Sequence, residues 1–125
     1  MVRKLTFAYA VFFCGVVAVG YVPQLITYQG NVRLLLGLFE LSLIDDITHG
    51  VTALTALIAA VVSRPLCLLF LTAFGYYYGL DAIFYLTYGF FNEKPYIQDI
   101  LLNLPHVLIS GSMLAIVYLL APRRE

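Results

Sequence analysis

The sequence of 125 residues contains no tryptophan, only two cysteines and few charged side chains. Charged residues make up 11% of the chain and hydrophobic residues 62%, whereas an average soluble domain is about 25% charged and about 45–50% apolar. This shortage of charge excludes a disordered tail and an ordinary soluble enzyme. Seven basic residues balance seven acidic ones, so there is no excess positive charge of the kind that binds nucleic acid.

Catalytic sequence motifs are absent as well. The chain has no glycine-rich phosphate loop, no HExxH zinc motif, no CxxC pair and no GxSxG nucleophile elbow. We therefore expect a protein that is not an enzyme. The two cysteines, Cys14 and Cys67, fall within apolar runs, and we interpret them as small packing residues.

What the sequence does contain is a series of long uncharged runs. A helix that crosses a bilayer needs about 20 mostly apolar residues. Four such spans fit the sequence, at about 5–28, 45–63, 66–90 and 101–121. The sequence therefore predicts an all-α fold, a four-helix transmembrane bundle that forms a single integral membrane domain over residues 1–125.

The segment before the second span leaves two possibilities open. Residues 31–44 are apolar enough to lie in the membrane interface, which would put Asp45 and Asp46 at the membrane boundary. Alternatively, the second helix begins earlier, near Asn31, and contains both aspartates in its outer turns.

The distribution of lysine and arginine predicts an orientation. With four spans, both termini and Arg64 share one side, which has five basic residues against two on the other side. The positive-inside rule then places both termini in the cytoplasm of a protein of the cell (plasma) membrane. Both histidines fall on the outer side.

The two halves of the chain also resemble each other. Matching positions lie 60 residues apart in the first two cases and 57 apart in the last: Ile26-Thr27-Tyr28 with Leu86-Thr87-Tyr88, Gly15 with Gly75, and Asp46-x-x-His49 with Asn103-x-x-His106. This series predicts two repeated helical hairpins, at about 5–64 and 65–122, related by a pseudo-twofold axis along the membrane normal.

Each histidine follows a residue that is typical of helix starts. Asp46 and Asn103 are both good N-cap residues, and His49 and His106 would then occupy the N3 position of a capping box. Pro105 would fall in the first turn, where a helix tolerates proline. In this interpretation both histidines are structural residues at the membrane interface.

A functional interpretation uses the same spacings. Residues three and four apart share one helix face, so each histidine would lie beside polar groups of its own helix. If both faces point inward, a polar site forms near the outer face from Asp45, Asp46, His49, Asp81, Asp99, Asn103 and His106. Such a site suits a divalent metal such as Zn²⁺, a proton relay or a haem held by the two histidines.

Asp81 is the charge that lies deep within a predicted span. A lone carboxylate in that position costs at least ~2.5–3.5 kcal/mol unless it is paired or protonated. The candidate partners are His49, His106, Arg33 and a tyrosine hydroxyl. Asp81 is then either one half of a buried bond that fixes helix register or a carboxylate that binds a proton or a substrate.

Further polar residues fall on the apolar helices. We interpret Ser110 and Ser112 as residues that hydrogen-bond one helix to another. Tyr76, Tyr77 and Tyr78 lie too deep for an interfacial aromatic belt, so we expect them to bond to neighbouring helices.

The paired helix starts resemble a family of small bacterial four-helix membrane proteins that is catalogued as a domain of unknown function. In that family a polar residue precedes a histidine at the head of the second and fourth helices, with small residues after it. The matching residues here are Asp46, His49 and Gly50, and then Asn103, His106 and Gly111. The resemblance implies a fold and a membrane location, and no activity.

Taken together, these patterns predict a non-enzymatic binding, transport-accessory or assembly protein with a polar Asp/His site near the outer face. The expected partners are the lipid bilayer and either a second copy, in a homo-oligomer, or a larger membrane partner. Two alternatives stay open at this point. One is a metal- or haem-binding redox protein that uses His49 and His106, and the other is proton-linked transport through Asp81.

Overall fold

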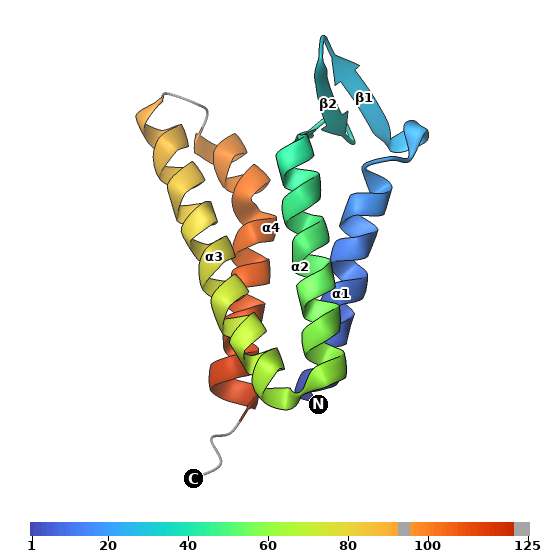
Figure 1. Ribbon diagram of the computed structural model, residues 1–125. Coiled ribbons are helices and arrows are strands. Elements are labelled where there is room, and N and C mark those ends of the chain that lie inside the picture. The colour runs from blue at the N-terminus through green and yellow to red at the C-terminus, as the bar shows by residue number, and fades with distance from the viewer. Residues whose placement is uncertain (93–95, 122–125) are drawn as a thin grey trace. The chain divides into compact units, whose positions relative to one another are not determined.

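A computed structural model describes the backbone of residues 1–92 and 96–121, and the side chains of residues 1–92 and 100–121. The described chain contains four α-helices, α1 (Val2–Val19), α2 (Leu43–Val62), α3 (Arg64–Phe91) and α4 (Tyr96–Ala115) (Figure 1). A π-helical segment, η2 (Ile116–Leu120), continues α4. All four helices are long and apolar enough to cross a membrane, which confirms the predicted all-α class with four membrane helices.

The chain divides into two compact units, each built on a pair of helices. Unit 1 comprises Met1 and residues 3–64 and contains α1 and α2, and unit 2 comprises Val2 and the residues from Pro65 onward and contains α3, α4 and η2. The sequence repeat between the two halves of the chain stays a prediction.

Unit 1 contains a small antiparallel sheet that was not predicted from the sequence. The predicted first span, 5–28, is too long, because α1 ends at Val19. A short 3₁₀ helix, η1 (Pro23–Leu25), then leads into β1 (Ile26–Gln29), β2 (Val32–Leu35) and β3 (Phe39–Leu41), in the order β1-β2-β3. Pro23 lacks the N–H that a continuing helix would need, and the β-branched and aromatic residues after it favour strands.

Two tight connections join the three strands. Gln29 pairs with Val32 across the first connection, where Gly30 has a φ of 61°, the positive value that a type II′ turn requires at its first central residue. Leu35 pairs with Phe39 across the second connection, where the Leu38 amide donates to the Leu35 carbonyl at 3.0 Å. In Figure 1 the β1–β2 connection lies at the end of the sheet away from the helices of this unit.

Helix α2 begins at Leu43, which corrects two predictions. Ser42 is the N-cap, and the Asp45 amide donates to its hydroxyl at 3.1 Å while the Ser42 amide donates to the Asp45 carboxylate at 2.9 Å. This reciprocal capping box satisfies amides that have no partner within the helix. Asp46 is therefore not the N-cap, and His49 is not at N3. The alternative that this helix begins near Asn31 is wrong, because those residues form β2 and β3.

Helix α4 begins at Tyr96, which is earlier than the predicted span of 101–121 and than the predicted N-cap, Asn103. Asn103 is thus inside the helix and is not an N-cap, and His106 is not at N3. Pro105 lies in the helix interior, where it removes one backbone hydrogen bond. A membrane helix tolerates this loss where neighbouring groups compensate for it.

Small residues line the inner faces of the helices in both units. In unit 1 the buried residues of α2 are Thr52, Ala53, Ala56, Ala59 and Ala60. The Arg3 side chain, at the start of α1, donates to the Ala60 carbonyl at 2.7 Å. The two helices of unit 1 are therefore antiparallel neighbours with the small side chains between them.

In unit 2 the close approach of α3 and α4 depends on glycine. A Cβ atom on Gly75 would lie 2.8 Å from Leu114 Cδ2, and one on Gly79 would lie 2.7 Å from Ser110 Oγ. These glycines form a GxxxG pair, which is typical of tightly packed membrane helices. The Ser110 hydroxyl donates to the Gly75 carbonyl at 2.7 Å, and this bond confirms the predicted helix-to-helix role of Ser110.

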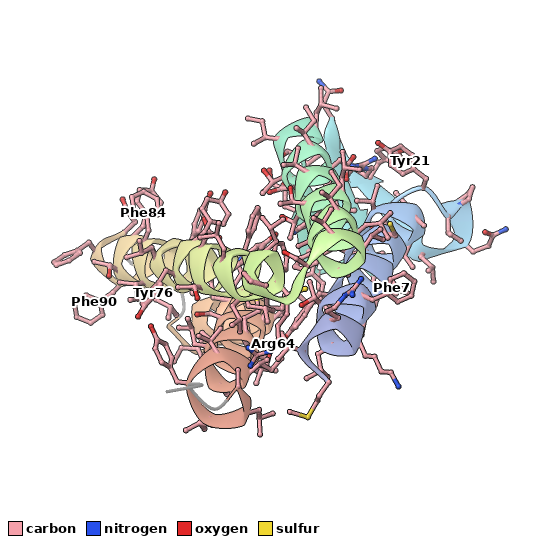
Figure 2. All side chains as sticks on the ribbon, turned by 60° about the horizontal axis from the view of Figure 1, so that its bottom comes forward. Phe7, Tyr21, Arg64, Tyr76, Phe84 and Phe90 are labelled. Atoms are coloured by element: carbon pink, nitrogen blue, oxygen red, sulfur yellow. The ribbon has the colours of Figure 1, made fainter. Side chains whose placement is uncertain are left out.

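The outer faces of the helices display large apolar side chains. Phe7 of α1 and Phe84 and Phe90 of α3 project outward in Figure 2, and each of these side chains is at least half exposed. A water-soluble helix would place polar residues on such a face. These faces suit contact with lipid.

Candidate functional site

Asp81 and His106 form the most unusual polar contact in the membrane helices. The Nδ1 atom of His106, on α4, lies 3.0 Å from the Oδ2 atom of Asp81, on α3. Less than a third of each side chain is exposed. Of the four partners that the sequence suggested for Asp81, the structure thus selects His106.

The surroundings of this pair are mostly apolar. The His106 imidazole packs against the ring of Tyr78, with the ring centroids 5.6 Å apart, and Tyr78 is almost fully buried. Nδ1 itself is buried and is not aligned for a hydrogen bond, so its approach to Asp81 is an ion-pair contact whose charge depends on protonation of the imidazole. A single proton on this pair leaves it without net charge.

A second polar cluster lies in unit 1, where the sheet meets the helices. Asp46, in the first turn of α2, accepts from Arg33 of β2 at 2.6 Å and from the Tyr21 hydroxyl at 2.7 Å, both on the same oxygen, Oδ2. The Arg33 guanidinium also lies over the Tyr21 ring, 4.9 Å from its centroid. The pKa of Arg33 is raised above its ordinary value, mainly by the hydrogen bond to Asp46 and to a smaller extent by the interaction with Tyr21.

The three polar residues predicted to act together on α2 have separate roles. Asp45 is occupied by the capping box with Ser42, and Asp46 binds Arg33 and Tyr21. His49 stacks on the Phe13 ring of α1, with the centroids 5.8 Å apart and the planes at 27°. These residues of α2 thus contribute a cap, an ion pair and an aromatic contact, and His49 also interacts electrostatically with Asp46.

Each histidine has the same kind of neighbour within its own unit. His49 packs on Phe13 of α1 and His106 packs on Tyr78 of α3, so in both units the ring comes from the preceding helix. The carboxylates differ, because Asp46 binds an arginine whereas Asp81 contacts a histidine.

Two predicted site residues remain. Asn103 is buried in α4, and the side chain of Asp99 lies outside the described residues. Among the side chains that the structure describes, no group of three or more His, Cys, Asp or Glu residues is arranged to hold a metal ion. Neither Cys14 nor Cys67 is in a disulfide. Metal or haem binding by His49 and His106 stays a prediction.

The partners of Asp46 were not predicted from the sequence. Arg33 was considered only as a partner of Asp81, and Tyr21 was placed inside a membrane span. One feature of the sequence could have indicated the contact between Arg33 and Asp46. Arg33 is a lone basic residue in an apolar segment that precedes the Asp45-Asp46 pair. A cavity of about 240 Å³ beside these residues is lined by Gly20, Tyr21, Pro23, Ile26, Tyr28 and Arg33.

Comparisons with protein-family models, curated proteins and solved structures give no match to this chain. Any function must therefore be inferred from the geometry of the two polar clusters.

Proposed function

We propose that this chain is a small, non-enzymatic, multi-pass protein of the cell membrane whose Asp81–His106 pair binds and releases a proton. The protein would serve as a binding or transport-accessory subunit that responds to this proton. The observation that supports the proposal is the 3.0 Å approach of His106 Nδ1 to Asp81 Oδ2 between two apolar helices.

The chemistry of the pair favours proton exchange. A carboxylate beside a neutral imidazole carries one negative charge, which is costly at membrane depth. One added proton converts the pair either to an ion pair or to two neutral groups, and in both forms the net charge is zero. Histidine is a common proton acceptor and donor in proteins, and ionisable side chains inside membrane segments often form proton relays.

The position of the pair along its helices supports access from one side. Asp81 precedes the end of α3 at Phe91 by ten residues, and His106 follows the start of α4 at Tyr96 by ten residues. At roughly 1.5 Å per residue, both side chains lie about 15 Å from the same end of this helix pair. The positive-inside rule assigns that end to the outer side, with both termini in the cytoplasm.

Infrared difference spectroscopy tests this proposal. The purified protein in lipid nanodiscs is measured at pH 8 and pH 5, and the difference spectrum reports carboxylate and imidazole bands that change with protonation. We expect Asp81→Asn to remove a carboxylate band from the difference spectrum and His106→Gln to alter the same band. His49→Gln is the matched control, because it removes the other histidine and leaves the pair intact.

The outcomes separate the alternatives. Loss of the carboxylate band in Asp81→Asn, with no change of that band in His49→Gln, supports the proposal. A carboxylate signal that is the same in wild type, Asp81→Asn and His106→Gln contradicts it. Proton flux into vesicles then distinguishes proton-linked transport, in which Asp81→Asn abolishes flux, from an accessory role without flux. The resemblance to bacterial four-helix membrane proteins and the formation of a homo-oligomer stay predictions.

A further inference from the structure

The small sheet of unit 1 has one polar and one apolar connection, at opposite ends. The β1–β2 connection consists of Gly30 and Asn31 and follows Gln29, whereas the β2–β3 connection is Leu36-Gly37-Leu38. Because the strands are antiparallel, adjacent connections lie at opposite ends of the sheet. One end of the sheet is therefore polar, at Gly30-Asn31, and the opposite end is apolar, at Leu36-Gly37-Leu38.

The residue type at the apolar connection is unexpected for its backbone conformation. Leu36 has a φ of 54°, and Gly37 has a φ of 70°, the pattern in which asparagine and glycine are favoured. Burial of the Leu36 side chain does not compensate for this unfavourable backbone conformation, because 62% of its surface is exposed. Leu38 is 61% exposed beside it. These two side chains are held outward at a turn that would accommodate polar residues better.

The apolar connection lies close in sequence to exposed apolar residues of a membrane helix. The Leu36 amide donates to the Leu25 carbonyl at 2.8 Å, so the connection lies at the end of the sheet that is nearest to α1. The first residues of α2, Leu43 and Ile44, are the next large exposed apolar side chains along the sequence. They belong to a helix that is long and apolar enough to cross a membrane.

Few charged residues lie in this region. Arg33 and Asp46 are paired with each other at 2.6 Å. Between residues 34 and 44 Glu40 is the only charged residue, and it lies on β3 between the less exposed Phe39 and Leu41. Successive residues of a strand point to opposite faces, so its carboxylate is directed away from the face that these neighbours occupy.

We infer that the sheet is an interfacial lipid anchor, with Leu36 and Leu38 inserted among the lipid headgroups and acyl chains and with Gly30-Asn31 in water. Interfacial segments of this kind bury their apolar residues by about 5–10 Å. The anchor fixes the depth at which α1 ends and α2 begins. This inference goes beyond the proposed function and does not depend on the Asp81–His106 pair.

The absence of tryptophan makes a direct test possible, because one introduced tryptophan is the only one in the chain. Leu38→Trp and the matched control Asn31→Trp are each prepared in vesicles with and without brominated lipids. For Leu38→Trp we expect blue-shifted fluorescence, a loss of intensity with brominated lipids and weak quenching by aqueous iodide. For Asn31→Trp we expect the opposite pattern, with strong iodide quenching.

A second variant separates lipid contact from folding. Leu36→Asn suits the positive φ at this position, so the variant should fold in detergent as well as the wild type does. Combined with Leu38→Trp, it should reduce quenching by brominated lipids. Equal iodide quenching at positions 31 and 38 would overturn the inference. Shielding of position 38 from iodide without quenching by brominated lipids would also overturn it, because a protein surface would then cover the connection.

Discussion

The carboxylate of Asp81 on α3 lies 3.0 Å from the imidazole of His106 on α4, which joins a charge deep in one membrane helix to the one histidine of that unit. The contact lies one helical turn from Tyr78, whose ring packs on the same imidazole. Within unit 2 this arrangement places a carboxylate and an imidazole in contact beside a buried aromatic ring.

The first prediction concerns the energy of this contact. Asp81→Asn, His106→Gln and the double variant form a double-mutant cycle, measured by unfolding in mixed detergent micelles. Residues in direct contact have coupling energies of about 0.5–3 kcal/mol, and we expect a value in this range with the single variants each less stable than wild type. A zero coupling energy for Asp81 and His106 would contradict the contact.

The second prediction concerns the glycines between α3 and α4. A Cβ on Gly75 would lie 2.8 Å from Leu114 Cδ2 and 3.3 Å from Met113 Cβ. Overpacking of this kind costs about 1–3 kcal/mol, which outweighs the gain of roughly 0.5–1 kcal/mol from replacing a helical glycine. We expect Gly75→Ala to lower the unfolding free energy.

Gly15→Ala is the matched control for this prediction. No atom outside its own helix backbone lies within 4 Å of a Cβ at this position, so only the helix propensity changes. We expect a gain of up to about 1 kcal/mol. The same direction of change in both variants would argue against the tight packing of α3 on α4.

The third prediction tests the start of α2. Ser42→Ala removes the hydroxyl that accepts from the Asp45 amide at 3.1 Å, and loss of an N-cap costs about 0.5–2 kcal/mol. Ser42→Thr keeps a hydroxyl and should retain most of the stability. If thermal unfolding in detergent shows that Ser42→Ala and Ser42→Thr behave alike, Ser42 is not the cap.

The fourth prediction concerns the attachment of the sheet to α2. Arg33→Gln removes the 2.6 Å ion pair to Asp46 and the contact over the Tyr21 ring. We expect faster amide hydrogen exchange in β2 and β3, measured by mass spectrometry in nanodiscs, with little change in α1. Glu40→Gln changes a charge of the same sheet outside this network and is the control. Unchanged exchange in Arg33→Gln would show that the sheet is held by its backbone bonds alone.

The membrane helices could be predicted because their physical cause is visible in the sequence. A run of about 20 residues with little charge has few alternatives to a membrane helix, and α2 and α3 match the predicted spans closely. The sheet was missed because Ile26, Val32 and Leu34 are as apolar as a continued span. The pattern that specified it was local, with Pro23 after Gly20 and then two turns containing glycine.

The helix starts were predicted less well, and the candidate site changed as a result. Asp46 and Asn103 have the right chemistry for N-caps, yet Ser42 caps α2 and Asn103 is buried within α4. Capping propensity identifies the residues that can serve as N-caps. The position at which each helix begins depends on the fold of the preceding segment, which capping propensity does not give. The contact of Asp81 with His106 was among the predicted partners, but the choice among four partners required the packing of α3 on α4.

The pairing of His106 with Asp81, on which the proposed proton-binding role rests, is tested most directly by a measured distance between the two side chains in a lipid bilayer. In His49→Gln protein the remaining imidazole belongs to His106, so ¹⁵N-histidine and ¹³C-carboxyl-aspartate labels report its nearest carboxylate by solid-state NMR dipolar dephasing. We predict strong dephasing, as the 3.0 Å approach of Nδ1 to Oδ2 requires, and its loss in Asp81→Asn. Absent dephasing, or dephasing that persists in Asp81→Asn, would contradict the pairing on which the proposed function rests.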